Sequence, residues 1–170
     1  KPLKTVMKRY LSAITSWGFR NMIVVASHGD PFHLIAIVKA CDFVSRKFSV
    51  NAISPLGAMF SSKQLGIDLE QSAAVDSMLE KYPNDFHAGW VETSMMLDID
   101  SSCVGDFQRS PDVSVSEREM ISPRSYCAKT AGLGHLGFPR LAEKSLGREL
   151  NTSSASYLAG IAERMIGAQS

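Results

Sequence analysis

A chain of 170 residues, 45% hydrophobic and 21% charged, has the size and composition of one globular domain with a substantial core. Its formal net charge of +1 gives no electrostatic reason to expect nucleic acid or an anionic membrane as a partner. The longest strongly apolar runs, Met22–Ala26 and Leu34–Val38, are too short to span a bilayer, and the amphipathic start Lys1–Arg9 does not resemble a secretion signal. We therefore expect no membrane association and no nucleic-acid binding.

The three cysteines, Cys41, Cys103 and Cys127, are odd in number and widely spaced. Without a Cys-x-x-Cys pair, neither a disulfide framework nor a structural zinc site is indicated. Cys41 stands among apolar residues and is expected to be a buried thiol. A reducing cytoplasm is the expected location.

The first third of the chain predicts alternating helices and strands. Apolar residues recur at helical spacing over Leu3–Trp17, and the short apolar run in Asn21–Ser27 is typical of a buried parallel strand. A second helix is expected over Phe32–Lys47 and a second strand over Ser49–Ser54. This order predicts a three-layer α/β/α sandwich with a mainly parallel sheet, in a single domain over residues 1–170.

The rest of the chain is expected to be mainly helical. Asp68 is placed to cap a helix over Leu69–Lys81, with Gln71 completing a capping box, and Val91–Ile99 is expected to be helical too. We assign no structure to the polar, turn-rich stretch Ser101–Ala131.

Two further helices are expected near the end of the chain. Pro139 marks the start of a helix that runs to Leu150. A last helix is expected over Asn151–Ile166, capped by Asn151 or Thr152.

The first candidate site, Ser27-His28-Gly29-Asp30-Pro31, directly follows the first predicted strand. Ligands of open α/β sheets collect at the carboxyl ends of strands, and an imidazole and a carboxylate two residues apart can reach one metal ion or two adjacent ions. The alternative is that Asp30 caps the next helix beside a surface histidine. His33 falls within the predicted helix and is expected to be structural.

The second candidate site combines His87, expected on a loop, with Glu92 in the first turn of the next helix. The two side chains could serve as a base and its orienting partner. Alternatively, Glu92 stabilises the positive end of the helix dipole and nothing more.

A third pattern, Gly132-Leu133-Gly134-His135-Leu136-Gly137, matches Gly-x-Gly-x-x-Gly. A dinucleotide-binding fingerprint needs a strand before it and a helix that begins within it. Here a polar segment precedes the glycines, and the predicted helix starts only after the last of them. We therefore expect a flexible loop that closes over a site, rather than a nucleotide site.

Together these segments resemble the creatininase family of creatinine amidohydrolases and related deformylases. That family carries a His-Ala-Gly-x-x-Glu-Thr-Ser-x-Met-Leu signature, which His87–Leu97 fits at every defined position. Residues Ser27–Pro31 are similar to the family's strand-end motif Asn-Gly-His-x-Glu-Asn or Asn-Gly-His-Gly-Gly-Asn. A weaker likeness to the family's Gly-Asp-Pro loop and the helix after it comes from Gly137-Phe138-Pro139, Ala142 and Gly147. The resemblance covers about Gly18–Arg164.

The resemblance implies a dinuclear zinc or manganese site, in which His28 would bind one ion and Asp30 the other. His87 would be the catalytic histidine, which shuttles a proton between a metal-bound water and the leaving nitrogen, and Glu92 would orient it. Gly89 and Trp90 would line the substrate pocket, although Trp90 could equally pack against the core. It also implies a homo-oligomer, as in the family's hexamers, acting on a small-molecule amide.

The sequence departs from the family at several points. Pro31 replaces an asparagine and Phe138 replaces the aspartate of the Gly-Asp-Pro loop. The family's first strand supplies a Glu-x-His pair and an aspartate that complete both metal sites, and this chain contains no such segment. We therefore expect either the C-terminal two-thirds of such a domain or a metal-free relative. The chain starts at Lys1 rather than at a methionine, which favours the former.

The leading hypothesis is hydrolysis of a non-peptide C–N bond in a cyclic amide or formamide by a two-metal mechanism. Creatinine, a formylated pyrimidine and a peptide-derived lactam all remain open as substrates. One alternative is a non-catalytic, creatininase-like scaffold or assembly subunit that has lost its metal site. Another is an α/β hydrolytic domain with a single metal ion.

Overall fold

The computed structural model describes residues 2–58, 69–116, 119 and 128–167. The chain divides into two compact units, Lys1–Asp68 with Tyr157–Ser170, and Leu69–Ser156. The expectation of one domain over residues 1–170 stays a prediction.

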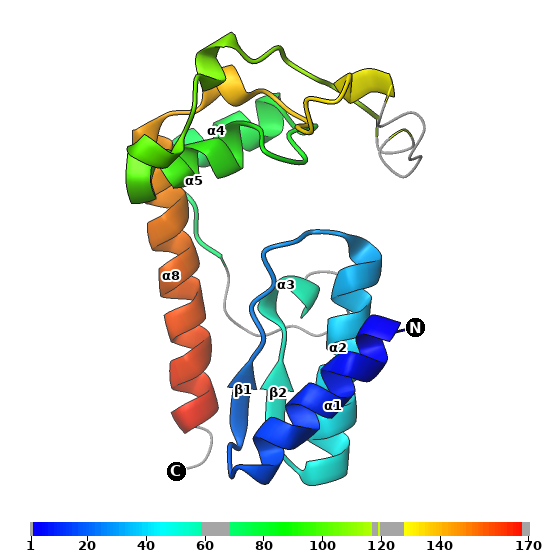
Figure 1. Cartoon of the computed structure of the whole chain (residues 1–170). Coiled ribbons are helices and arrows are strands. Elements are labelled where there is room, and N and C mark those ends of the chain that lie inside the picture. The colour runs from blue at the N-terminus through cyan, green and yellow to red at the C-terminus, as the bar shows by residue number, and fades with distance from the viewer. Residues whose placement is uncertain (1, 59–68, 117–118, 120–127, 168–170) are drawn as a thin grey trace. The chain divides into compact units, whose positions relative to one another are not determined.

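The first unit has the predicted alternation of helices and parallel strands (Figure 1). The strands pair in parallel, with Met22 opposite Ala52 in the centre of the register. The elements are α1 (Pro2–Ser16), β1 (Asn21–Ile23), α2 (Pro31–Phe48), β2 (Asn51–Ile53) and the short α3 (Pro55–Ala58). The predicted α/β class with parallel strands is confirmed. The sheet within the described residues has two strands of three residues each, shorter than the runs Asn21–Ser27 and Ser49–Ser54 that the sequence indicated.

Local sequence explains where α2 begins and ends. Asp30 accepts a hydrogen bond from the His33 backbone N–H, and Pro31 occupies the first turn, where no amide hydrogen is needed. Ser49 takes a left-handed conformation at the other end, with φ of 53°. The core of the unit is then built from the inward faces of both long helices and both strands. Its buried members are Leu11, Met22, Ile37, Ala40, Cys41, Val44, Val50 and Ala52.

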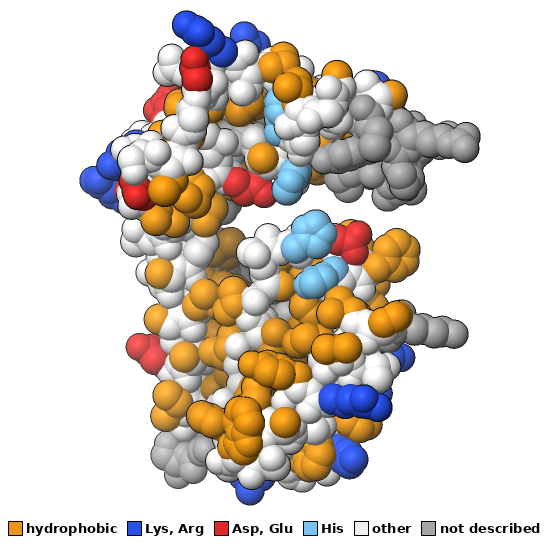
Figure 2. All heavy atoms as spheres, viewed as in Figure 1, with side chains coloured by type: hydrophobic (Ala, Val, Ile, Leu, Met, Phe, Trp, Pro, Cys, Tyr) orange, Lys and Arg blue, Asp and Glu red, His pale blue; other side chains and the backbone are white. Residues whose placement is uncertain are grey.

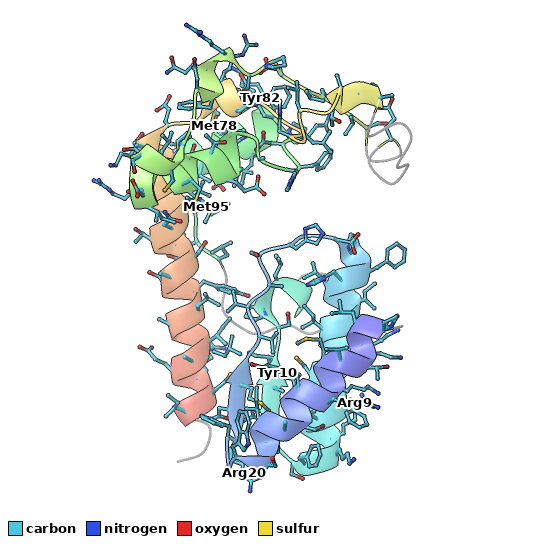
Figure 3. All side chains as sticks on the ribbon, viewed as in Figure 1. Arg9, Tyr10, Arg20, Met78, Tyr82 and Met95 are labelled. Carbon is cyan, nitrogen blue, oxygen red and sulfur yellow. The ribbon has the colours of Figure 1, made fainter. Side chains whose placement is uncertain are left out.

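The second unit consists of helices and short turns around its own apolar cluster. Its elements are α4 (Ala73–Lys81), α5 (Trp90–Asp100), the 3-10 turns η1 (Ser101–Cys103), η2 (Phe107–Arg109) and η3 (Pro139–Leu141), and the first part of α8 (Lys144–Gly167). The buried cluster comprises Val75, Trp90, Ala142, Leu146 and Leu150. Met78 and Tyr82 from the α4 segment and Met95 from α5 pack against it, as partly buried side chains (Figure 3).

The predicted start of α4 is wrong. The helix begins at Ala73, and Ser72 is its N-cap, accepting a hydrogen bond from the Val75 backbone N–H at 3.2 Å. The helix therefore excludes the first residues of Leu69–Lys81, so Gln71 completes no capping box. Asp68 lies outside the described residues. The Ser72 hydroxyl satisfies one of the free amides that the predicted cap was meant to satisfy.

The prediction of two separate C-terminal helices is also wrong. Pro139 opens only a 3-10 turn, and α8 then runs without a break from Lys144 to Gly167. Asn151 and Thr152 lie inside this helix and cap nothing. The Asn151 amide instead donates hydrogen bonds to the backbone carbonyl of Met95 and to the Asp98 carboxylate, both on α5.

Within its described residues, the stretch that the sequence left unassigned contains η1, η2 and one β-bridge. Val113 pairs with Gly137 there, and residues 128–130 form a helical turn. None of the described helices combines the length and the apolar character needed to cross a membrane.

Candidate functional site

The first candidate group lies on residues 24–30, which leave the sheet after β1 and lead into α2. Asp30 Oδ1 accepts the capping hydrogen bond from His33 N at 2.7 Å, so the capping role of Asp30 is confirmed. His28 is exposed, and its ring meets the His33 ring edge-on, with centroids 5.6 Å apart. Figure 2 shows two histidine side chains together at this end of the first unit. A capping carboxylate oxygen and an exposed imidazole thus stand close in the chain.

This group does not make a complete metal site by itself. Across residues 2–58, 69–116, 119 and 128–167, no cluster of three or more His, Cys, Asp or Glu side chains could hold an ion. His28 and Asp30 are ligands of the right chemical type for zinc or manganese, but two ligands fall short of the three protein ligands of catalytic zinc sites. Any ion held here would need donors beyond the described ones.

The second candidate group is built on a backbone that is hydrogen-bonded to a distant segment. The backbone N–H groups of Phe86 and His87 both donate to the Leu136 carbonyl at 2.9 Å, and Leu136 N–H donates back to His87 at 2.7 Å. Ala88 then turns the chain with φ of 48°, a left-handed value that is uncommon outside glycine. His87 is thereby fixed through its backbone, while its imidazole is exposed.

Asp85 holds the start of α5 in place. Its Oδ1 accepts hydrogen bonds from the backbone N–H groups of Trp90 at 3.0 Å and Phe138 at 2.8 Å. Its Oδ2 accepts from Val91 N–H at 3.1 Å. The carboxylate therefore caps α5 and also ties the segment after Gly137 to it, which Gly89 as the formal N-cap cannot do without a side chain.

Sequence reasoning gave Asp85 no role, although it is the most extensively bonded side chain of the motif. A local signal exists in hindsight. An aspartate four residues before a glycine that opens a helix is placed to reach the free amides of the first turn. The bond to Phe138 joins residues 53 positions apart and has no local signal.

Glu92 and Trp90 lie on opposite sides of the first turn of α5. Glu92 is exposed, and within the described part of the chain no hydrogen bond or ion pair joins it to His87. Trp90 is completely buried in the apolar cluster, and its indole N–H has no hydrogen-bond partner among the described residues. Packing of Trp90 in the core is thus observed, while substrate binding by Trp90 and Gly89 stays a prediction.

The glycine-rich segment does not have the setting of a dinucleotide fingerprint. A helical turn, residues 128–130, precedes it, and Gly132 and Gly134 take left-handed φ values of 81° and 82°. The buried His135 ring places Nε2 2.7 Å from the Pro111 carbonyl, and Leu136 pairs with His87. One end of this segment is therefore fixed against the His87 motif.

The fold and these motifs define an α/β protein of the creatininase type. Residues 1–161 match the model of the creatininase family, described as creatinine amidohydrolase. The chain belongs to the creatininase family. No match was found among curated protein sequences.

Solved creatininases have a similar fold. A mutant creatininase complexed with creatine has a TM-score of 0.69 and 17% identity, and the match covers 96% of this chain and 65% of that one. A mutant creatininase of Zn-Zn type has a TM-score of 0.68 and 18% identity, and the match covers 96% of this chain and 64% of that one. A creatininase named for Mn has a TM-score of 0.67 and 18% identity, and the match again covers 96% of this chain and 64% of that one. The chain thus has a creatininase-like fold and spans less than two-thirds of the length of these proteins, 64% or 65% in each case.

Proposed function

We propose that the protein hydrolyses a C–N bond other than a peptide bond, in a cyclic amide or formamide, as a creatinine amidohydrolase-like enzyme. The observation that carries the proposal is the His87–Leu97 motif, whose exposed histidine has its backbone paired with Leu136 and whose helix start is capped by Asp85. Membership of the creatininase family supports the same reaction class. A small-molecule amide is accordingly the proposed substrate.

His87 is proposed as the proton carrier of this reaction. Breaking an amide C–N bond requires a proton on the departing nitrogen, and histidine side chains can gain and lose one near neutral pH. The paired backbone around His87 fixes where its side chain leaves the main chain, as the positioning of an acid–base group requires. Glu92 is proposed to orient this histidine.

His28 and Asp30 are proposed as two ligands of a dinuclear divalent metal site, with zinc or manganese as the ion. The relatives named for Zn-Zn and Mn support a divalent metal. Because the described residues bring no third donor to this pair, the remaining ligands are proposed to come from residues outside them.

The alternative function is a creatininase-like scaffold without catalysis. The absence of a cluster of three donors among the described residues favours it. The enzyme and the scaffold would have the same fold, but only the enzyme would bind metal ions, so metal analysis distinguishes the two proposals.

The first experiment is elemental analysis of the purified protein, with its intact mass measured on the same sample. About two zinc or manganese ions per chain would support the dinuclear enzyme. A metal-free protein whose mass matches 170 residues would instead support the scaffold.

Matched variants then assign the residues. We expect His28→Gln and Asp30→Asn to lower the metal content, while His33→Gln, which changes the neighbouring imidazole, leaves it unchanged. His87→Gln should keep the metal but no longer hydrolyse creatinine or other cyclic amides. NMR spectra of the substrate measure this hydrolysis. Full hydrolysis by His87→Gln would contradict the proposed role. Light scattering of the same samples tests the proposed homo-oligomer, for which a hexamer is expected.

A further inference from the structure

A basic and largely open cavity lies between α1 and α2 of the first unit, and its lining includes no residue of either candidate group. Its volume is about 500 Å³. Its lining residues are Lys4, Lys8, Lys39, Asp42, Phe43, Arg46 and Lys47. Figure 2 shows Lys and Arg side chains on this side of the first unit. The size lies within the usual range of small-molecule sites, roughly 300–1,000 Å³.

Positive charge is concentrated in this cavity. Five of its lining side chains are cationic and one, Asp42, is anionic, which leaves an excess of four positive charges. The whole chain carries a formal net charge of only +1. Like charges that share one hollow repel one another, and a bound anion would remove that repulsion.

Phe43 organises the cations of the cavity. Lys8 Nζ lies 4.0 Å from the Phe43 ring centroid, and Lys47 Nζ lies 5.5 Å from the same centroid and 5.1 Å from that of Phe48. Both ammonium groups are within the range of attraction to an aromatic face. The ring thus holds ammonium groups from α1 and α2 around one centre.

We propose that this cavity binds a compact polyanion, namely a small molecule that carries two or more phosphate groups. Lysine ammonium groups bind phosphate oxygens as point charges, and the guanidinium of Arg46 can hold two of them at once. A nucleic acid fits less well, because its phosphates need a basic surface that extends along the molecule, and the chain as a whole is nearly neutral. The inference does not depend on the proposed hydrolase activity.

Arg46 and Lys47 also stand in the last turn of α2, where positive charge stabilises a helix. A purely structural role for the basic residues would therefore show in stability and not in anion binding. Both quantities need to be measured on the same variants.

The test is calorimetric titration of the full chain with inorganic pyrophosphate at low and at high ionic strength. The cavity variant is Lys8→Gln with Arg46→Gln. The control is Arg9→Gln with Lys81→Gln, which changes the net charge equally; Arg9 is on α1 but outside the cavity lining (Figure 3). Glutamine has nearly the same helix propensity as lysine and arginine, so both proteins should fold, which circular dichroism checks.

We expect the unmodified chain and the control to bind pyrophosphate with the same affinity, and the cavity variant to bind it at least about tenfold more weakly. Binding to the unmodified chain should weaken at high salt. No binding to the unmodified chain, or an equal loss in both variants, would overturn the proposal. So would a single-stranded oligonucleotide that binds well while pyrophosphate does not.

Discussion

The carboxylate of Asp85 occupies the space that a side chain at Gly137 would need. A Cβ at Gly137 would stand 2.1 Å from Asp85 Oδ1 and 3.0 Å from Gly89 Cα. A Cβ at Gly89 would meet the same carboxylate at 1.8 Å. The two glycines therefore let one aspartate reach the start of α5 and the segment after Gly137 together, which holds the His87 backbone in its place.

Gly137→Ala should destabilise the second unit by more than the cost of placing an alanine at a positive φ. The new methyl group would collide with Asp85, and φ at this position is 151°. Gly134→Ala is the control, because Gly134 also has a positive φ, 82°, but a Cβ there meets nothing within 4 Å. We expect Gly137→Ala to cost about 2 kcal/mol more than the control in urea unfolding. Equal losses of unfolding free energy in the two variants would mean that the Asp85 side chain can move away from the new methyl group at little cost.

Asp85→Asn tests the carboxylate itself. An asparagine could still accept through one oxygen, but its NH2 group would face the Val91 N–H, which then loses its acceptor. We expect a loss of about 2 kcal/mol in the free energy of unfolding. Asp76→Asn is the control, since Asp76 is exposed in the first turn of α4, and it should cost about 0.5 kcal/mol. If the two variants lose the same free energy of unfolding, the three hydrogen bonds that the Asp85 carboxylate accepts do not stabilise the fold.

The fold could be predicted where the signal is local. The ranges Leu3–Trp17 and Phe32–Lys47 agree with α1 and α2 within one residue at each end, because helical periodicity is repeated over several turns. The first strand is different. An apolar run indicates burial, but strand pairing also needs a partner, and β2 offers only Asn51–Ile53 within the described residues.

Asn151 shows why the last helix boundary could not be predicted. Its residue type is typical of an N-cap, yet its amide bonds to Met95 and Asp98, more than 50 positions away. That hydrogen bond is also the main reason that the pKa of Asp98 lies below its ordinary value. The candidate site follows the same rule. The motif predicted His87 and Glu92 as site residues. The hydrogen bond of Asp85 with Phe138 could not be predicted, because Phe138 comes from a distant segment.

Gly147→Ala should be destabilising although it lies inside a helix. Replacing glycine by alanine in a helix normally gains up to about 1 kcal/mol. Here the new Cβ would stand 1.8 Å from the Ser94 carbonyl oxygen, because α8 passes very close to α5. We expect a net loss of about 2 kcal/mol by urea unfolding. Gly167→Ala, at the end of the same helix, should cause no loss, because a Cβ added there would meet nothing within 4 Å. A stabilised Gly147→Ala protein would contradict the close approach.

Glu119 should make the stability of the second unit depend on pH in the acid range. The Ser116 backbone N–H, the Lys129 ammonium and the Ser116 hydroxyl all donate to its carboxylate and lower the pKa of Glu119 from 4.5 to about 2. Because the folded value is the lower one, the ionised form favours folding. This contribution is present above pH 4.5 and is lost as the pH falls toward 2.

The measurement compares thermal unfolding of the parent protein and Glu119→Gln at several pH values. The variant should melt at a lower temperature at neutral pH, and the difference should shrink as the pH falls through the window between 4.5 and about 2. Added salt should remove only part of the effect, because it screens the Lys129 pair but not the backbone hydrogen bond. Glu80→Gln, an exposed position on α4, controls for the change in net charge. A difference that is the same at every pH would show that Glu119 acts through its shape rather than its charge.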